Sequence, residues 1–413
     1  MLELKGISFM EHRIFSAADI LLPKNSAPDR WAVIACDQFS SDKGYWERVN
    51  RIARGVPSAL HMVVPEAFLD EIKTEEAASQ RNTVMDEYLS ADIFDTVPNS
   101  FVYVERTVTG GKTRRGIVGK LDLEAYDYKK GTDALVRASE KTLIERLPPR
   151  IAVRKGAAIE LPHIMVLIDD EKLSAVEPLG QIKERFPKLY DFDLMEGGGH
   201  IEGYRVSGSE AERVLSAIDG ICAKPLAMII GDGNHSLAAA KAYWDDIKAD
   251  LPESDRTSHP ARFALVELNN VYDEGITFEP IHRVVFGCNP LKLIDAIKKT
   301  FSSGSGREIR YLGGNIRGSV RIPSLSLGGL IGDVQQFLDE YTEKNGGIID
   351  YIHDDESAEE LSRNDGAVAL FMPAMDKSDL FSTVSAEGVF PKKSFSIGHA
   401  RDKRYYLECR RIK

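Results

Sequence analysis

Short apolar runs alternate with amphipathic stretches along almost the whole 413-residue chain. Uninterrupted apolar runs of about four to eight residues are typical of buried strands, and apolar positions three and four apart are typical of helices. We therefore expect a mixed α/β (α+β) protein, with mixed sheets and flanking helices in two main lobes. The predicted buried strands are 31–36, 162–170, 226–230, 262–268 and 366–374.

Helical spacing and turn residues predict the remaining helices and the hairpin. Residues 101–108 and 114–123 flank Gly110 and Gly111, which predicts a hairpin. Amphipathic spacing predicts helices over 44–54, 65–89, 133–147, 209–221, 290–302 and 330–343. We expect Pro148 and Pro149 to end the helix at 133–147, because proline removes a helix hydrogen bond. A final strand is expected at 404–412.

The chain is too long for one ordinary core, so we expect several domains. Turn-rich stretches near 128–132 and 286–290 are the candidate boundaries. They divide the chain into an N-terminal α/β lobe at 1–130, a central lobe at 131–288 and a C-terminal α/β segment at 289–413.

Composition and net charge indicate which classes of partner and which cellular location to expect. The formal net charge is −11, whereas a duplex nucleic-acid binder normally presents a basic face. The four cysteines are scattered and form no C-x-x-C motif, which favours reduced thiols. The N-terminus has no apolar signal region, and apolar runs stay below 18 residues. We expect a cytoplasmic protein that binds neither nucleic acid nor membrane; its oligomeric state stays open.

The segment Gly231-Asp232-Gly233-Asn234-His235-Ser236 joins the strand at 226–230 to a helix. Glycines permit close backbone approach, and a helix N-terminus presents unpaired N–H groups with partial positive charge. This combination can hold a phosphate or carboxylate. Gly231, Gly233, Asn234 and Ser236 are therefore candidate phosphate-binding residues, and Asp232 and His235 are candidate catalytic residues. Alternatively, Asp232 or Asn234 merely caps the helix.

Several segments, in order, resemble a known family. The strand–D-G-x-H–helix run is similar to the D-G-H-H-R box of the bacterial family catalogued as domain of unknown function 1015. The other matching segments are 34–39, 116–126, 140–170, 280–283 and 390–397. Asn234 stands where the family has the first histidine of the box, and Ser236 stands where it has arginine.

The same box also resembles that of the ParB–sulfiredoxin superfamily, which includes free serine kinases. This resemblance implies that one lobe is ParB–sulfiredoxin-like and that the turn holds nucleotide phosphates, with ATP or ADP and Mg²⁺ as the expected cofactors. An upstream acid, which we assign to Asp37, would activate the acceptor. His282, Arg283, Lys392 and Lys393 are candidate phosphate-binding cations, since arginine and lysine both bind phosphate.

Three functions follow as hypotheses. The first is a nucleotide-dependent phosphotransferase acting on a small hydroxylated metabolite. The alternatives are a non-catalytic nucleotide-binding or regulatory protein, and a hydrolase of an anionic small molecule that uses Asp232 and His235. Glu196, His200 and Glu202 alternate along a predicted strand, so periodicity alone places them on one face, and we assign no metal site.

Overall fold

The chain divides into two compact units. The computed structural model describes residues 13–24, 27–71, 74–301, 306–324 and 326–413. Unit 1 comprises the chain up to residue 138, residues 142–276 and residues 400–413, and unit 2 comprises 139–141 and 277–399. Thus the C-terminal segment returns to unit 1, whereas the predicted lobes 1–130, 131–288 and 289–413 are three consecutive pieces.

Unit 1 is built on an 11-stranded mixed sheet in the order β10-β11-β4-β5-β13-β9-β12-β7-β6, with β1 on β5 and β2 on β4. The predicted mixed α/β class is confirmed. The strands are β1 (Phe15–Ser16), β2 (Ala18–Pro23), β4 (Phe94–Thr107), β5 (Thr113–Asp122), β6 (Tyr126–Asp127), β7 (Val136–Ala138), β9 (Met165–Ile168), β10 (Lys188–Asp193), β11 (His200–Val206), β12 (Met228–Asp232) and β13 (Phe263–Asn270).

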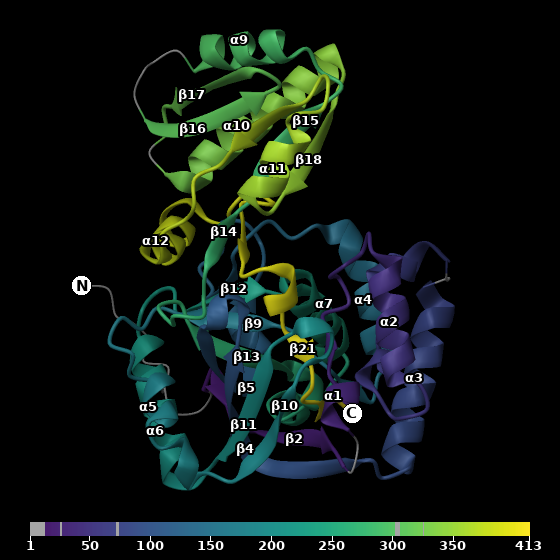
Figure 1. Cartoon of the computed structure of the whole chain (residues 1–413). Helices are drawn as coiled ribbons and strands as arrows, with labels where there is room; N and C mark the ends of the chain where they lie inside the picture. The colour runs from purple at the N-terminus through teal and green to yellow at the C-terminus, as the bar shows by residue number, and fades with distance from the viewer. Residues whose placement is uncertain (1–12, 25–26, 72–73, 302–305, 325) are drawn as a thin grey trace, which may run out of the picture. The chain divides into compact units, whose positions relative to one another are not determined.

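Helices cover both faces of this sheet, because successive side chains of a strand point to opposite faces. Val102 and Val104 of β4 join one apolar core, and Phe101 and Tyr103 join the other. In Figure 1, α2 and α3 lie on one side of the sheet and α6 on the other. The helices of unit 1 are α1 (Pro28–Trp31), α2 (Lys43–Ala53), α3 (Thr74–Ser90), α4 (Leu147–Gly156), α5 (Glu177–Gly180), α6 (Gly208–Ile221), α7 (Asn234–Lys248) and α8 (Glu253–Arg256).

Two short strand pairs attach the C-terminal segment to unit 1. Strand β21 (Tyr405–Tyr406) is antiparallel to β3 (Val33–Ile34), and β22 (Arg410–Arg411) is antiparallel to β8 (Ile159–Glu160). The single strand predicted at 404–412 is therefore two short ones.

Unit 2 contains a five-stranded antiparallel sheet in the order β17-β16-β19-β15-β18, and a separate pair β14-β20. Its strands are β14 (Phe278–Pro280), β15 (His282–Phe286), β16 (Arg307–Gly313), β17 (Ile316–Ile322), β18 (Ile348–Ile352), β19 (Val368–Phe371) and β20 (Phe395–Ile397). Its helices are α9 (Pro290–Thr300), α10 (Leu327–Asn345), α11 (Asp355–Leu361) and α12 (Lys377–Glu387).

The predicted helix at 133–147 is wrong. Residues 136–138 form β7, and Pro148 and Pro149 lie in the first turn of α4. Proline is tolerated there because the first helical N–H groups have no carbonyl partner within the helix. Within the described ranges, we find no helix with the length and apolar character that crossing a membrane requires.

Candidate functional site

The predicted strand–turn–helix forms as expected between β12 and α7. Gly233 is the residue before α7, and its backbone is left-handed with φ 80° and ψ 24°. A Cβ atom at this position would lie 3.0 Å from the Cα atom of Ile164. Glycine is therefore required both by backbone conformation and by close packing. The Gly233 N–H donates to the Asp232 Oδ1 at 2.8 Å, which fixes that carboxylate beside the turn.

The segment just before β9 brings a histidine to the same edge of the sheet. Because β9 is antiparallel to β12, with Met165 opposite Asp232, β9 begins where β12 ends. His163 therefore lies close to the turn in a buried position. Its ring packs edge-on against the ring of Tyr406, with centroids 5.3 Å apart.

The pairing of β3 with β21 brings Asp37 near a lysine. The Ala35 N–H donates to the Arg404 carbonyl at 3.0 Å just beyond this ladder, and the charge of Lys403 acts on the Asp37 carboxylate. Lys403 is buried, and its Nζ lies 3.5 Å from the Asp232 Oδ2. Asp37 and Asp232 lie far apart in the sequence, and both lie near Lys403 in the structure.

Arg106 of β4 fixes the backbone that carries Lys403. Its buried guanidinium donates to the carbonyls of Arg401, Asp402 and Lys403, and twice to that of Gly198. The Arg114 guanidinium adds a bond to the Asp402 carbonyl at 2.6 Å. Arginine suits this task because its five donors form a rigid fork. We call Asp37, His163, Asp232, His235 and Lys403 the turn cluster.

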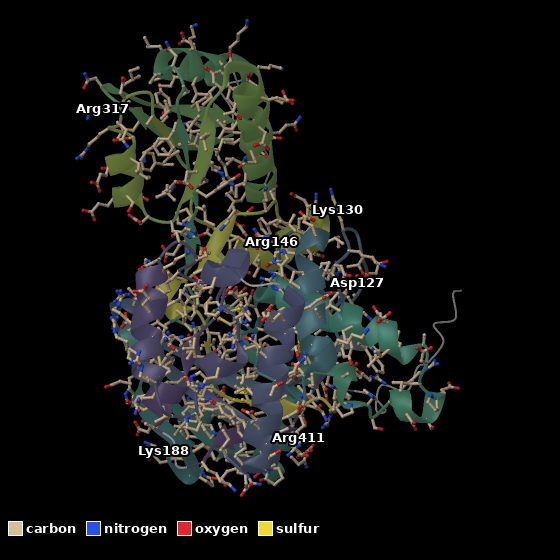
Figure 2. The ribbon with its side chains drawn as sticks, turned by 90° about the vertical axis from the view of Figure 1, so that its right-hand side faces the viewer. Asp127, Lys130, Arg146, Lys188, Arg317 and Arg411 are labelled. Atoms are coloured by element: carbon tan, nitrogen blue, oxygen red, sulfur yellow. The ribbon has the colours of Figure 1, made fainter. Side chains whose placement is uncertain are left out.

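His235 is neutral in this setting. Its Nε2 accepts a hydrogen bond from the Leu143 N–H at 3.2 Å, which leaves the proton on Nδ1. Burial lowers the pKa of His235 to about 4, and the positive charges of Arg150 and Arg146 add to this effect. Arg146 is exposed just before α4 (Figure 2). The imidazole therefore lies in a positive local field.

The Asp37 carboxylate is also affected by nearby positive charges. Burial by itself would raise its pKa, but the pKa is lowered overall because the charges of His163, Arg150 and Lys403 stabilise the ionised form. A hydrogen bond from the Gln38 side chain acts in the same direction. Charges of Arg150 thus act on both Asp37 and His235, which indicates that the structure brings these two predicted residues into one region.

The remaining turn residues contribute differently. Gly231 is the penultimate residue of β12 and is half-buried, and Asn234 is buried at the first position of α7. Ser236 is half-buried and lines a cavity of about 200 Å³ in unit 1. A role for these three residues in binding phosphate stays a prediction.

The other predicted cations belong to unit 2. His282 is buried and bonds through Nε2 to the Asp355 Oδ1 at 2.8 Å, and Arg283 is buried with its Nε donating to the Gln335 Oε1 at 3.2 Å. Lys392 and Lys393 are exposed, and the Lys393 N–H donates to the Glu140 carboxylate at 3.2 Å. Their assignment to a phosphate site also stays a prediction.

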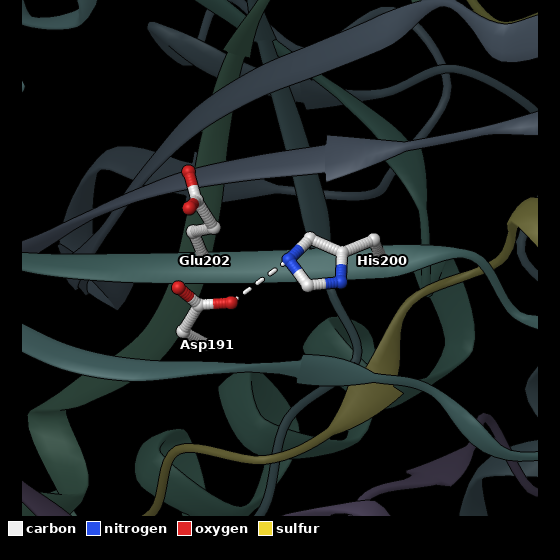
Figure 3. A group of neighbouring side chains, drawn as sticks. All are labelled: Asp191, His200 and Glu202. Atoms are coloured by element: carbon white, nitrogen blue, oxygen red, sulfur yellow. Dashed lines mark ion pairs between the residues drawn. The ribbon is translucent and has the colours of Figure 1, made fainter.

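His200 lies in a polar group at the edge of the large sheet (Figure 3). Its Nε2 is 2.9 Å from the Asp191 Oδ1, and ligand atoms of Asp191, His200 and Glu202 lie within 4.8 Å of one another. The Nζ of Lys188 is 2.6 Å from Asp191, and that of Lys183 is 2.7 Å from Glu202. Ammonium groups thus already compensate these carboxylates. Glu196 instead pairs with the Nε of Arg48 at 2.9 Å.

Sequence reasoning missed three residues of the site: Arg150, His163 and Lys403. Two local signals were available. His163 interrupts the apolar run of a predicted strand, and Lys403 directly precedes one. Neither signal identifies the partner, because Lys403 approaches Asp232 only through the β3–β21 pairing.

With the fold established, comparison identifies the family. The profile of "Protein of unknown function (DUF1015)" matches residues 17–390. The chain belongs to this family. The resemblance carried by the ordered boxes is therefore confirmed, and the family's description assigns no activity. A search of curated proteins gives no match.

Solved structures similar to this family member share little sequence with it. One is a conserved hypothetical protein from Pyrococcus furiosus, with TM-score 0.35 and 13% identity over 69% of this chain and 92% of that chain. A free serine kinase in complex with AMP has TM-score 0.39 and 12% identity, over 70% of this chain and 92% of its own. C-terminally truncated SbnI from Staphylococcus aureus has TM-score 0.35 and 8% identity, over 68% and 82%.

Proposed function

We propose that the protein is a phosphotransferase that binds nucleotide phosphates at the turn 231–236 and transfers a phosphoryl group to a small hydroxylated acceptor. The observation that carries this proposal is the convergence of cations on a helix N-terminus. Lys403 and Arg150 act on the turn cluster, and the first N–H groups of α7 have no carbonyl partner within the helix. Together they favour an anion at the turn.

The carboxylates supply the second requirement of phosphoryl transfer, which is an oriented acceptor. In the proposed reaction, Asp37 accepts the proton of the acceptor hydroxyl. A bond forms between that oxygen and the terminal phosphorus, while the bond to the oxygen of the leaving nucleoside diphosphate breaks. His235 holds a proton on Nδ1 and can donate it in a hydrogen bond to a phosphate oxygen. Lys403 compensates charge on the transferred group.

Carboxylate oxygens are the ligands that Mg²⁺ prefers, so Asp37 and Asp232 fit a nucleotide-bound Mg²⁺. Such an ion would neutralise phosphate charge when bound. Asp232 also pairs with Lys403, so an incoming phosphate would compete with the carboxylate for this ammonium group.

Binding is tested with a matched pair of lysine variants. Calorimetric titration of the whole chain with ATP and ADP in Mg²⁺ should give saturable binding. Lys403→Gln should weaken it about 10-fold to 100-fold, since a hydrogen bond to a charged group contributes about 1.5–3 kcal/mol. Lys413→Gln is the control, because Lys413 is exposed and its Nζ donates to the Gly156 carbonyl at 2.8 Å. Absence of binding at millimolar nucleotide would refute the proposal.

Turnover is tested separately from binding. Product mass spectrometry with ATP and a pool of hydroxylated metabolites should reveal a phosphorylated product. Asp37→Asn should abolish that product while the thermal melting curve and the binding of nucleotide without Mg²⁺ stay close to those of the wild type. Nucleotide binding without any product or phosphate release would instead support the non-catalytic binding protein, and phosphate release without an acceptor would support the hydrolase.

A further inference from the structure

A partly open cavity of about 200 Å³ lies in unit 1 beside the turn. Ser236 and Ile164 line it, and both are close neighbours of Gly233. Most of its wall is apolar and comes from elements far apart in the sequence. The apolar wall includes Met62, Met85, Val153, Ile159, Ala239 and Ile412.

Several polar residues of the wall are connected to one another, and Arg154 and Glu160 form a separate ion pair in it. The Tyr406 hydroxyl bonds to the Cys36 Sγ at 3.1 Å and accepts from the Cys36 N–H at 3.3 Å. The Cys36 carbonyl accepts from the Glu66 N–H at 2.8 Å, and the Glu66 carboxylate is paired with Arg150. His163 packs against the Tyr406 ring. These polar groups therefore form one continuous patch of the wall.

This polar patch adjoins the proposed catalytic base. Cys36 immediately precedes Asp37 in the chain, and His163 and Arg150 both act on the Asp37 carboxylate. The Cys36 thiol is not a second nucleophile, because burial raises its pKa to about 12. The cavity wall is thus linked to the reacting region through Cys36, Arg150 and His163.

We propose that this cavity holds an apolar group of the acceptor, so that the substrate is a hydroxylated molecule with a branched aliphatic or aromatic body. The inference rests on the proposed function and specifies its substrate class. Protein interiors are normally close-packed, and an apolar cavity of about 150 Å³ can hold benzene. The cavity beside the turn is therefore large enough for a phenyl ring or a short branched chain, with the hydroxyl directed toward Asp37.

The polar head and the apolar body contribute separately to affinity. Burying one methylene group contributes about 0.8 kcal/mol, which is about a fourfold change in affinity. Acceptors with several buried carbons should therefore bind far better than serine or glycerol, which offer hydroxyls but little apolar surface.

The test measures binding of defined alcohols to the whole chain. Saturation-transfer NMR with 2-phenylethanol and 3-methylbutan-1-ol should give binding, and serine and glycerol at equal concentration should not. Val153→Phe, which fills the cavity, should weaken binding of 2-phenylethanol at least 10-fold. Ala152→Phe is the matched control, because Ala152 is the adjacent residue of α4 but does not line the cavity, and it should change binding less than twofold.

Each outcome separates the two proposals. Equal binding of apolar and polar alcohols, or binding that survives Val153→Phe, overturns the cavity assignment even if nucleotide binds. Binding of 2-phenylethanol without any nucleotide binding supports the cavity but refutes the phosphotransferase. If both bind, phosphorylation of the apolar alcohols in preference to serine supports the substrate class, and the reverse preference overturns it.

Discussion

Removing the Arg106 guanidinium should loosen the segment that carries Lys403. Arg106→Met keeps an apolar stem but leaves three backbone carbonyls, those of Gly198, Arg401 and Lys403, without the guanidinium donor, while the Asp402 carbonyl keeps its bond from Arg114. A buried acceptor left unsatisfied costs about 1–3 kcal/mol, so about 1 kcal/mol for each of the three carbonyls gives a loss of about 3 kcal/mol. This is a large share of the stability of an ordinary domain.

Tryptophan fluorescence is well suited to measure this loss. The three tryptophans, Trp31, Trp46 and Trp244, all lie buried in unit 1, so urea unfolding followed by their emission reports on that unit. Hydrogen exchange should also accelerate at the amides of 400–406 in Arg106→Met. Lysine cannot rescue the effect fully, because its three donors leave from a single nitrogen.

The control for Arg106 is Arg114, which donates to the Asp402 carbonyl of the same segment. Arg114→Met should have the smaller effect on exchange at 400–406. If Arg106→Met changes the free energy of unfolding by less than about 1 kcal/mol and leaves that exchange unchanged, the carbonyl contacts do not hold the segment. The reasoning that assigns Arg106 a positioning role would then be refuted.

Three further predictions concern the turn and its surroundings. Gly233→Ala should cost about 1–3 kcal/mol more than Gly131→Ala in urea unfolding, because both have positive φ but only Gly233 has a close backbone neighbour; equal losses would exclude the contact with Ile164 as a cause. Because the pKa of His235 is about 4 when folded and about 6.5 when unfolded, the unfolded state binds the proton first. Stability should therefore fall as pH drops from about 6.5 to about 4, and less so in His235→Gln; parallel pH profiles would contradict this. Since the pKa of Cys36 is raised to about 12, its alkylation by iodoacetamide at about pH 8 should be about a thousandfold slower than that of an unperturbed cysteine, as measured by peptide mass spectrometry; rapid labelling of the native chain would disprove the burial argument.

Local signals predicted the elements that rely on neighbouring residues. The hairpin around Gly110 and Gly111 forms as β4 and β5, with Thr107 opposite Thr113. The apolar run before Gly231 becomes β12, and helical spacing after Gly233 becomes α7. In these cases periodicity and turn chemistry act over a few residues, so the sequence alone is sufficient.

Tertiary pairing decided the features that sequence could not predict. The segment at 31–36 is apolar throughout, yet Trp31 ends helix α1 and only Val33–Ile34 form a strand, because β21 pairs with just those residues. The same pairing places Lys403 near Asp37 and Asp232. Its sequence neighbourhood contains no sign of this contact, since the partners lie more than a hundred residues away.

The return of residues 400–413 to unit 1 has a consequence for synthesis of the chain. Ribosomes deliver the N-terminal part first, so the turn at 231–236 and Asp37 leave the ribosome well before Lys403. Until then β3 lacks its partner strand and Asp232 lacks its ammonium group. A nascent chain therefore cannot assemble the complete turn cluster, and competence for the proposed chemistry arises only when translation has passed through the whole of unit 2.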